Sequence, residues 1–201
     1  QIEYVQSSSV EDELSNMVLV VRPNLSNDFT VQFTLKYVSN VETDCYIDWG
    51  DGQREPVDRY ISAGSLVFHE YQISEPKSYE VKISGADPSD LTSCKVPKLD
   101  SYSLPIHSVE EVVQWGQTGL TDLSSAFRGN QILKKVAADD GGSFVNVTSC
   151  SSMFSGCTAL EEIPSGLFDN CAKVTNFSSA FSGCKSLKSL PSGLFSNCKE
   201  V

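Results

Sequence analysis

The chain has 201 residues, of which 40% are apolar and 20% charged, a composition typical of a globular protein. The formal net charge of −11 comes from 26 acidic against 15 basic residues, and so acidic a surface repels phosphate backbones and anionic lipids. The longest apolar run, Met17 to Val21, is far shorter than the roughly 20 residues that a transmembrane helix needs. We therefore expect no nucleic-acid partner and no transmembrane segment in this chain.

The N-terminal half carries most of the acidity and shows strand periodicity. Residues 1–98 hold 16 acidic and 8 basic side chains, a net charge of −8, whereas residues 147–201 hold 4 of each. Apolar and polar residues alternate in three runs, and a fourth run is rich in β-branched residues: Val31 to Tyr37, Cys45 to Trp49, Tyr79 to Ile83, and Met17 to Arg22. Several short strands with period two, separated by turn residues, predict an antiparallel β-sandwich over residues 1–98.

Three motifs follow this pattern in chain order: Asp48-Trp49-Gly50-Asp51-Gly52, His69-Glu70-Tyr71, and Tyr79-Glu80-Val81-Lys82-Ile83. In this order they resemble the PKD-type immunoglobulin-like domain, over roughly residues 17–85. The resemblance implies an immunoglobulin-like sandwich in which Trp49, His69 and Tyr71 are structural residues. Independently of it, glycines in a tight turn accept positive φ, and aspartates there accept hydrogen bonds from neighbouring amides.

A repeat of 27 residues dominates the C-terminal half. Residues 147–173 align with residues 174–200 without a gap, so that Phe154 pairs with Phe181 and Cys157 with Cys184. A decayed copy begins at Leu120, which places the repeat starts near residues 120, 147 and 174. One turn of this length cannot bury its own apolar face, so stacked turns must share a core. We therefore expect these two phenylalanines and two cysteines to be structural.

The repeated phrase F-x-G-C-x-x-L-x-x-I-P-x-G-L-F resembles the BspA-like leucine-rich repeats of bacterial surface proteins, and Gln114-Trp115-Gly116 resembles the entry to such arrays. We therefore expect a leucine-rich-repeat solenoid over residues 99–201, with short strands and helical or irregular turns. Pro88, Pro97 and Pro105 predict an irregular linker over residues 86–106. The resemblance implies an exported, often lipid-anchored bacterial protein that interacts with host matrix proteins, other cells or glycans, without catalysis.

Each repeat contains an L-x-x-I segment, which we expect to be a short strand with its two middle residues outward. Charges at these positions alternate in sign between repeats, and such cross-strand pairs contribute about 0.2–1 kcal/mol each. Two interpretations remain open: contacts that stabilise the stack, or a ligand-binding face. The candidate binding residues are Lys134, Lys135, Glu161, Glu162 and Lys188.

The seven cysteines predict buried thiols rather than chemistry. Cys157 and Cys184 share one repeat position, Cys171 and Cys198 share another, and both positions need a small apolar group. Cys45 falls at an inward strand position, where we expect a core thiol. Disulfides between neighbouring turns remain an alternative. The sequence has no C-x-x-C pair, which argues against a metal site.

Residues that catalyse reactions are not indicated by any motif. His69 is one of only two histidines, and the sequence has no serine elbow, phosphate-binding loop or dinucleotide fingerprint, so we expect no catalytic residues and no cofactor. Asp48 and Asp51 flank a glycine turn and are weak candidates for calcium. Calcium needs about six to eight oxygen ligands, so a role in the turn is the expected one.

The leading hypothesis is a two-domain, non-catalytic recognition or adhesion protein that binds host or matrix proteins through its repeats. The alternative is glycan capture at the cell surface, for which the aromatic candidates are Tyr60, Tyr71, Tyr102 and Trp115. The first residues, Gln1 to Tyr4, show no signal features, so an exported protein must have its signal outside this sequence. An uncapped last repeat predicts possible end-to-end self-association.

Overall fold

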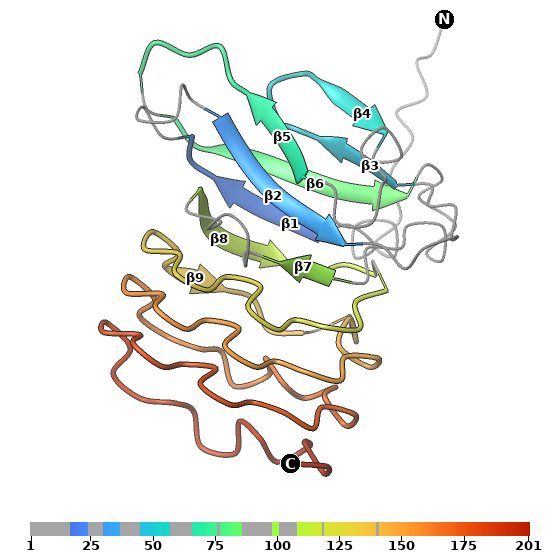
Figure 1. The fold of residues 1–201 in the computed structure, drawn as a ribbon, viewed down its shortest axis with the longest axis vertical. Helices are drawn as coiled ribbons and strands as arrows, with labels where there is room; N and C mark the ends of the chain where they lie inside the picture. The colour runs from blue at the N-terminus through green and yellow to red at the C-terminus, as the bar shows by residue number, and fades with distance from the viewer. Residues whose placement is uncertain are drawn as a thin grey trace, which may run out of the picture.

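The computed structural model describes residues 17–23, 30–36, 45–56, 66–75, 77–85, 98–100, 108–117, 119–139 and 141–201. Within these residues the protein consists of β-strands and turns, without a helix. The strands are β1 (Met17–Val21), β2 (Thr30–Lys36), β3 (Cys45–Asp48), β4 (Arg54–Pro56), β5 (Leu66–Glu70), β6 (Tyr79–Gly85), β7 (Lys98–Asp100), β8 (Val109–Gln114) and β9 (Lys135–Val136). Figure 1 shows most strands at one end of the molecule and a stack of coils at the other.

The strands form two sheets. The larger, sheet A, has the order β4-β3-β6-β1-β8-β9, and the smaller, sheet B, has the order β5-β2-β7. Neighbouring strands are antiparallel throughout, except that β8 and β9 are parallel. The β-rich class that the sequence predicts is therefore what the described residues show.

The three predicted period-two runs form strands β2, β3 and β6, and the run rich in β-branched residues forms β1. In β1, Met17, Leu19 and Val21 are buried, and β1 pairs Met17 with Ile83 and Leu19 with Val81 of β6. Directly opposite residues of paired strands project to the same face, so these apolar side chains gather on one side of sheet A. The alternation in β6 thus marks the buried face of the sheet, whereas β1 has buried residues on both faces.

The predicted linker contains a strand. Residues 98–100 form β7, which pairs Leu99 with Leu35 of β2, while the rest of the span 86–106 lies outside the described residues. The prediction of irregular structure was therefore wrong at these three positions. Prolines punctuate the sequence around them, and a strand of three residues is too short to show a period of its own.

Strand β8 joins the strand end of the molecule to the coils. It pairs antiparallel with β1, where Val21 lies opposite Val109 and Val20 opposite Glu111, so Glu110 is an extra residue in a β-bulge. On its other side β8 pairs in parallel with β9. Hydrogen bonding therefore crosses the predicted domain boundary near residue 98, and the division into two domains stays a prediction.

Residues 120–200 form three stacked coils, here called the coil stack: coil 1 (120–146), coil 2 (147–173) and coil 3 (174–200). Coils 1 and 2 each donate backbone hydrogen bonds to carbonyls 26 residues ahead. Coil 1 donates from Leu123, Ser125, Phe127 and Gly129, and coil 2 donates from Cys150, Ser152, Phe154 and Gly156, at 2.7–2.9 Å. In this segment the earlier coil always supplies the N–H donors and the later coil always supplies the carbonyl acceptors. The two edges of a coil therefore differ in their hydrogen-bonding groups.

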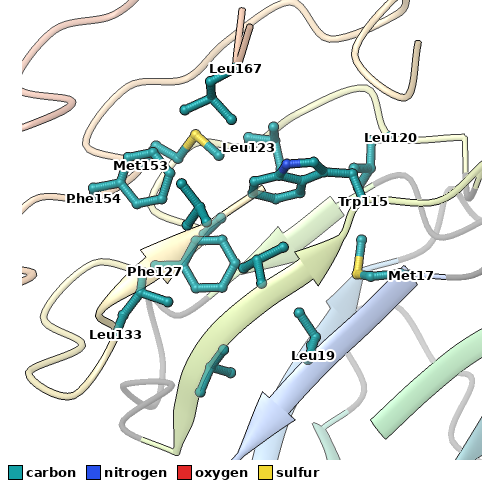
Figure 2. Packing of buried hydrophobic residues seen from close by; sticks show 14 of the residues in the cluster. Met17, Leu19, Trp115, Leu120, Leu123, Phe127, Leu133, Met153, Phe154 and Leu167 are labelled. Atoms are coloured by element: carbon teal, nitrogen blue, oxygen red, sulfur yellow. The ribbon is translucent and has the colours of Figure 1, made fainter. Parts of the chain in front are cut away.

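Apolar side chains fill the centre of the stack and continue into sheet A. Figure 2 shows Met17 and Leu19 of β1 near Trp115 and Phe127, and these residues belong to one buried cluster that reaches Cys198. The rings of Phe127 and Phe154 stack at 5.8 Å between centroids, and those of Phe154 and Phe181 at 5.6 Å. Neighbouring coils therefore share the core that a single coil could not build.

Glycine and serine hold the sharp bends of each coil. Gly129, Gly156 and Gly183 have positive φ, and a Cβ on Gly156 would lie 3.4 Å from the Cα of Gly129 in the coil before it. Ser125, Ser152 and Ser179 also adopt positive φ, at the same place in each coil. The left-handed backbone is therefore what favours glycine in this column, while a Cβ there would make ordinary contact with the neighbouring coil.

The expected L-x-x-I strands form only in part. Coil 1 contains β9, but coils 2 and 3 have no assigned strand at the matching positions. Glu161 donates one backbone hydrogen bond to Lys134 at 3.4 Å, and no backbone bond joins the next pair of segments within the described residues. Side-chain packing, rather than a continuous ladder, aligns these segments.

We expect Gly156→Ala to destabilise the protein by about 1–2 kcal/mol, because alanine disfavours the left-handed φ of this position. Urea unfolding monitored by circular dichroism measures the loss. Gly166→Ala is the control, because Gly166 has no positive φ while its Cβ would meet its nearest neighbours at the same distance, 3.4 Å. Equal losses in the two variants would contradict the argument from backbone conformation.

Candidate functional site

The exposed middle residues of the L-x-x-I segments form a charged surface along the coil stack. Lys134, Lys135, Glu161, Glu162 and Lys188 are all exposed, as the sequence predicts. Glu110 and Glu111 of β8 add a further rung, because β8 pairs Glu111 with Lys135 of β9. We call these seven residues the charged face. Its charge alternates from rung to rung, from two glutamates to two lysines and back.

Glu110 is the best-connected residue of the charged face. Its Oε1 accepts a hydrogen bond from Lys134 Nζ at 2.8 Å and lies 3.8 Å from the Arg22 guanidinium, while its Oε2 accepts one from Ser78 Oγ at 2.9 Å. The hydrogen bond from Lys134, helped by the one from Ser78, holds the pKa of Glu110 below its ordinary value despite partial burial. Glu110 therefore ties strands β1 and β8 to coil 1.

The charges divide into paired and unpaired sets. Lys134 bonds to Glu110, and Lys135 lies 3.7 Å from Glu111, so both lysines have acidic partners. No ion pair involves Glu161, Glu162 or Lys188 within the described residues. The pairs of Lys134 and Lys135 with Glu110 and Glu111 thus fit the stabilising interpretation. Glu161, Glu162 and Lys188 instead present their charges to solvent.

Sequence reasoning missed Glu110 and Glu111 as part of this surface. The signal was present, because Val109-Glu110-Glu111-Val112 matches Leu160-Glu161-Glu162-Ile163 in pattern. The spacing hid it: Val109 precedes Leu133 by 24 residues rather than 27. The shorter interval is tolerated because β8 belongs to sheet A and is not preceded by another coil.

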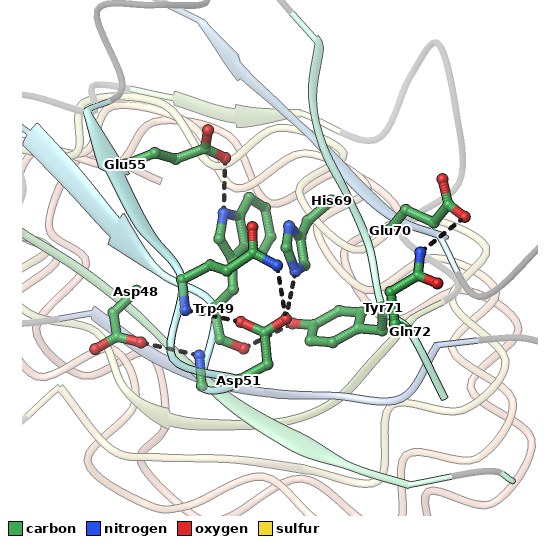
Figure 3. A network of polar contacts seen from close by, with 10 residues as sticks. Asp48, Trp49, Asp51, Glu55, His69, Glu70, Tyr71 and Gln72 are labelled. Carbon is green, nitrogen blue, oxygen red and sulfur yellow. Dashed lines mark hydrogen bonds and ion pairs between the residues drawn. The ribbon is translucent and has the colours of Figure 1, made fainter. Parts of the chain in front are cut away.

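A second cluster surrounds the glycine turn between β3 and β4 (Figure 3). His69 of β5 stacks on Trp49, at 4.7 Å between ring centroids, and its Nε2 lies 2.8 Å from Asp51 Oδ2. Tyr71 donates its hydroxyl to the Trp49 carbonyl at 2.8 Å, and the Trp49 indole donates to Glu55 at 2.8 Å. The turn of sheet A is therefore fastened to sheet B by rings and hydrogen bonds.

The two aspartates of this turn are engaged within the protein. Asp48 Oδ1 accepts the Gly50 N–H, and Asp51 Oδ1 accepts the Gln53 N–H. Partial burial opposes ionisation of Asp51, but the hydrogen bonds from His69 and Gln53 outweigh it and lower its pKa. Among the described residues no group of three potential ligands could hold a metal ion. The geometry therefore matches the turn role rather than calcium binding.

The aromatic candidates for glycan stacking are not presented as an open platform. Tyr71 and Trp115 are each 1% exposed, and the Trp115 indole donates to the Ala137 carbonyl at 2.8 Å. Tyr60 and Tyr102 lie outside the described residues. Sugars stack on exposed ring faces, so neither buried ring offers one.

The cysteines divide into two kinds. Cys150, Cys157, Cys171, Cys184 and Cys198 are free thiols within the coil stack, and the last four stand at the two repeat positions where the sequence predicts thiols. Cys45 is disulfide-bonded, so the expectation of a core thiol there was wrong; its partner is not one of these five. A buried strand position suits a half-cystine as well as a thiol, and the sequence pattern alone does not separate the two.

One column of side chains explains why cysteine recurs. Asn130, Cys157 and Cys184 occupy the same position in successive coils, and each donates to a backbone carbonyl: Asn130 to Val109, Cys157 to Phe127, and Cys184 to Phe154. Burial raises the pKa of Cys157 to about 12 and that of Cys198 to about 11. A raised pKa favours the protonated thiol, and Cys157 and Cys184 use this proton to donate to the carbonyls of the preceding coil.

A small cavity lies where β8 meets the loop after β9. Its volume is about 70 Å³, and it is lined by Trp115, Gly116 and Ala137 among others. That volume holds about two water molecules, far less than the roughly 300 Å³ of a small ligand pocket. The neighbouring Asp139 directs both carboxylate oxygens to the N–H groups of Ser143 and Phe144. This cavity is therefore too small for a metabolite.

Comparisons of the chain with protein-family models, curated proteins and solved structures found no match. In the described part of the chain, nothing forms a helix of the length and apolarity that a membrane crossing requires. The charged face is the surface on which a functional proposal can be built.

We expect Asp51→Asn to destabilise the protein by about 1–2 kcal/mol at neutral pH, because it removes a charge-assisted hydrogen bond to His69. A carboxylate with a lowered folded pKa contributes stability above its unfolded pKa and loses it as pH falls through the folded value. The variant should therefore differ most from the parent at neutral pH and converge with it well below pH 4. Urea unfolding across this pH range tests this, and a constant difference would contradict it.

We expect five thiols per chain to react with an aromatic disulfide reagent in denaturant without reductant, because Cys45 is bonded. In the native protein, reaction should be negligible at the four buried thiols, and any slow labelling should map to half-buried Cys184. Absorbance and peptide mass spectrometry count and locate the labels. Seven reactive thiols in denaturant would contradict the disulfide.

Proposed function

We propose that this protein is a non-catalytic recognition protein of the cell surface, which binds host or matrix proteins through its repeats. The observation that carries the proposal is the charged face, where Glu161, Glu162 and Lys188 are exposed beside lysines already held by Glu110 and Glu111. Charges of both signs on a fixed surface favour a protein ligand with a complementary pattern, because like-charge contacts exclude wrong partners.

The rigid mounting of the charged face supports this role. Sheet A continues from β4 through β8 into β9, and the apolar cluster continues with it. A binding surface whose backbone is already ordered loses little conformational entropy when a ligand binds. Residues of the candidate site therefore keep fixed positions relative to one another.

The proposal includes export and family membership. The disulfide at Cys45 supports an oxidising compartment, such as the cell exterior, since disulfides are rare in reducing cytosol. The paired sheets with their Trp-Gly-Asp-Gly turn support a PKD-type immunoglobulin-like domain, and the coil stack supports BspA-like leucine-rich repeats. Lipid anchorage and a bacterial source rest on these resemblances alone.

The absence of catalysis is also part of the proposal. His69 faces Asp51 and two aromatic rings and is 8% exposed, so it contacts no cysteine or serine nucleophile within the described residues. Burial raises the pKa of Cys157, Cys184 and Cys198, which favours the protonated thiol at these positions. These observations favour binding over hydrolysis.

The test is a binding screen of the purified chain against two immobilised panels, host matrix proteins and neutral polysaccharides. The double variant Glu161→Gln and Glu162→Gln removes the unpaired acidic rung with little change in size. We expect it to weaken binding to the responding matrix protein about tenfold or more, as loss of an interface hot spot does. Surface plasmon resonance gives both affinities.

Glu70→Gln is the matched control, since Glu70 is exposed and lies on β5 of sheet B, whereas the charged face begins on sheet A and continues along the coil stack. Its binding should equal that of the parent chain. Equal losses in both variants would indicate a general charge effect and contradict the proposed surface. Binding to polysaccharides alone would favour glycan capture instead.

A further inference from the structure

The small cavity between β8 and the loop after β9 reaches the surface beside Val113, which is 42% exposed. Its lining also includes Trp115, Gly116, Ala137 and Ala138. A cavity of about 150 Å³ accepts benzene, whereas this one has a volume of about 70 Å³. It therefore has room for one branched aliphatic side chain but not for an aromatic ring.

The side chains of Trp115, Gln117 and Asp139, in or beside the cavity, already have partners within the protein. The Trp115 indole donates to the Ala137 carbonyl at 2.8 Å, and the Gln117 amide donates to the Gly141 carbonyl. Both carboxylate oxygens of Asp139 accept backbone N–H groups. An apolar group that enters the cavity therefore leaves none of these polar groups without a hydrogen bond.

The cavity opens on the same side of sheet A as the charged face. Residues two apart in a strand project to one side, so Val113 shares a side with Glu111, and Ala137 with Lys135. The valine between the members of each pair is buried, as this alternation requires. One such step along a strand is about 7 Å. One short segment of a partner can therefore cover both the cavity and the charged face.

Glu162 is the acidic residue that the charged face offers to such a segment. It follows Lys135 by one repeat and stands one rung away, at a spacing of about 5 Å. Lys135 is already paired with Glu111 at 3.7 Å, and Ser189, the next residue of this column, is neutral. No ion pair of Glu162 is present in the described part of the chain. A basic residue of the partner complements this carboxylate.

We propose that the cavity is an anchor pocket for one small aliphatic side chain, such as valine, of an extended basic segment of a partner protein. This role rests on the proposed function and names the chemistry of the partner at the same surface. The valine fills the cavity beside Val113, while an arginine two residues along the segment reaches Glu162. A buried anchor beside a charge that fixes its position is how interfaces concentrate binding energy.

The test uses synthetic peptides rather than the matrix proteins of the screen, so it can fail independently of the proposed function. Each peptide carries one variable residue, arginine at the next two alternate positions, and serine elsewhere; each is also made in reverse order. The variable residue is valine, serine or phenylalanine. Amide chemical shifts of the isotope-labelled chain are followed during titration with each peptide.

We expect the valine peptide to bind about tenfold more tightly than the serine peptide, as the gain of apolar groups in a fitting pocket implies. It should shift the amides of Val113, Gly116 and Ala137, which line the cavity. The phenylalanine peptide should gain nothing over the serine peptide, because its ring exceeds the volume of the cavity. This order of affinities distinguishes a fitted pocket from general hydrophobic attraction.

Val113→Ser removes one apolar wall of the cavity, and we expect it to abolish the preference for valine. Val145→Ser is the matched control, because Val145 is 47% exposed and is not among the residues that line the cavity. It should keep the tenfold preference. Urea unfolding of both variants checks that the fold is intact, and the peptide series on the parent chain decides the outcome if a variant unfolds.

Equal affinities of the three peptides, with shifts confined to the charged face, would overturn the anchor pocket and leave the acidic surface in place. Absence of any binding also overturns it, whereas the proposed function is decided separately by the screen of matrix proteins. A preference for valine that persists in folded Val113→Ser would put the aliphatic side chain elsewhere and contradict the proposal.

Discussion

The coil-to-coil backbone hydrogen bond is the constraint on which the rest of the stack depends. Donors at alternate residues of one coil reach carbonyls 26 residues ahead, while the intervening N–H groups close turns within the same coil. The turns have positive φ at Ser152 and Gly156, and the bonds bring the backbone of Gly129 to within 3.4 Å of where a Cβ on Gly156 would lie. Side-chain columns then follow, because every coil repeats the same path.

Strand β8 joins the antiparallel part of sheet A to its parallel edge strand, β9. Its bulge at Glu110 interrupts the antiparallel pairing with β1, and on its other side β8 pairs in parallel with β9. The charged face begins there rather than at coil 1. One strand therefore both continues the sheet and supplies the first rung of the surface on which the proposed function rests.

The interior of the stack uses cysteine for its size and its weak donor. Asn130 meets the same need in coil 1 with an amide, which shows that the position requires a donor as well as a small group. The disulfide at Cys45 lies outside the coil stack, at the start of β3.

Local patterns in the sequence determined the strands, the coil period and the outward charges. Alternation in β1 and β6, the 27-residue spacing of Phe154 and Phe181, and the exposed pairs at Lys134 and Glu161 all follow from which side chains avoid water. These features depend on residues close in the chain or on a strict period, so the sequence alone reveals them.

Tertiary structure alone decided the remaining features, since they join residues at irregular separations. The pairing of β8 with β1, the contact between His69 and Asp51, and the bonding of Cys45 depend on how distant segments meet. The Glu110 rung escaped sequence reasoning because its spacing departs from the period by three residues. Periodicity predicts what repeats, whereas the junctions where a repeat begins are set by packing.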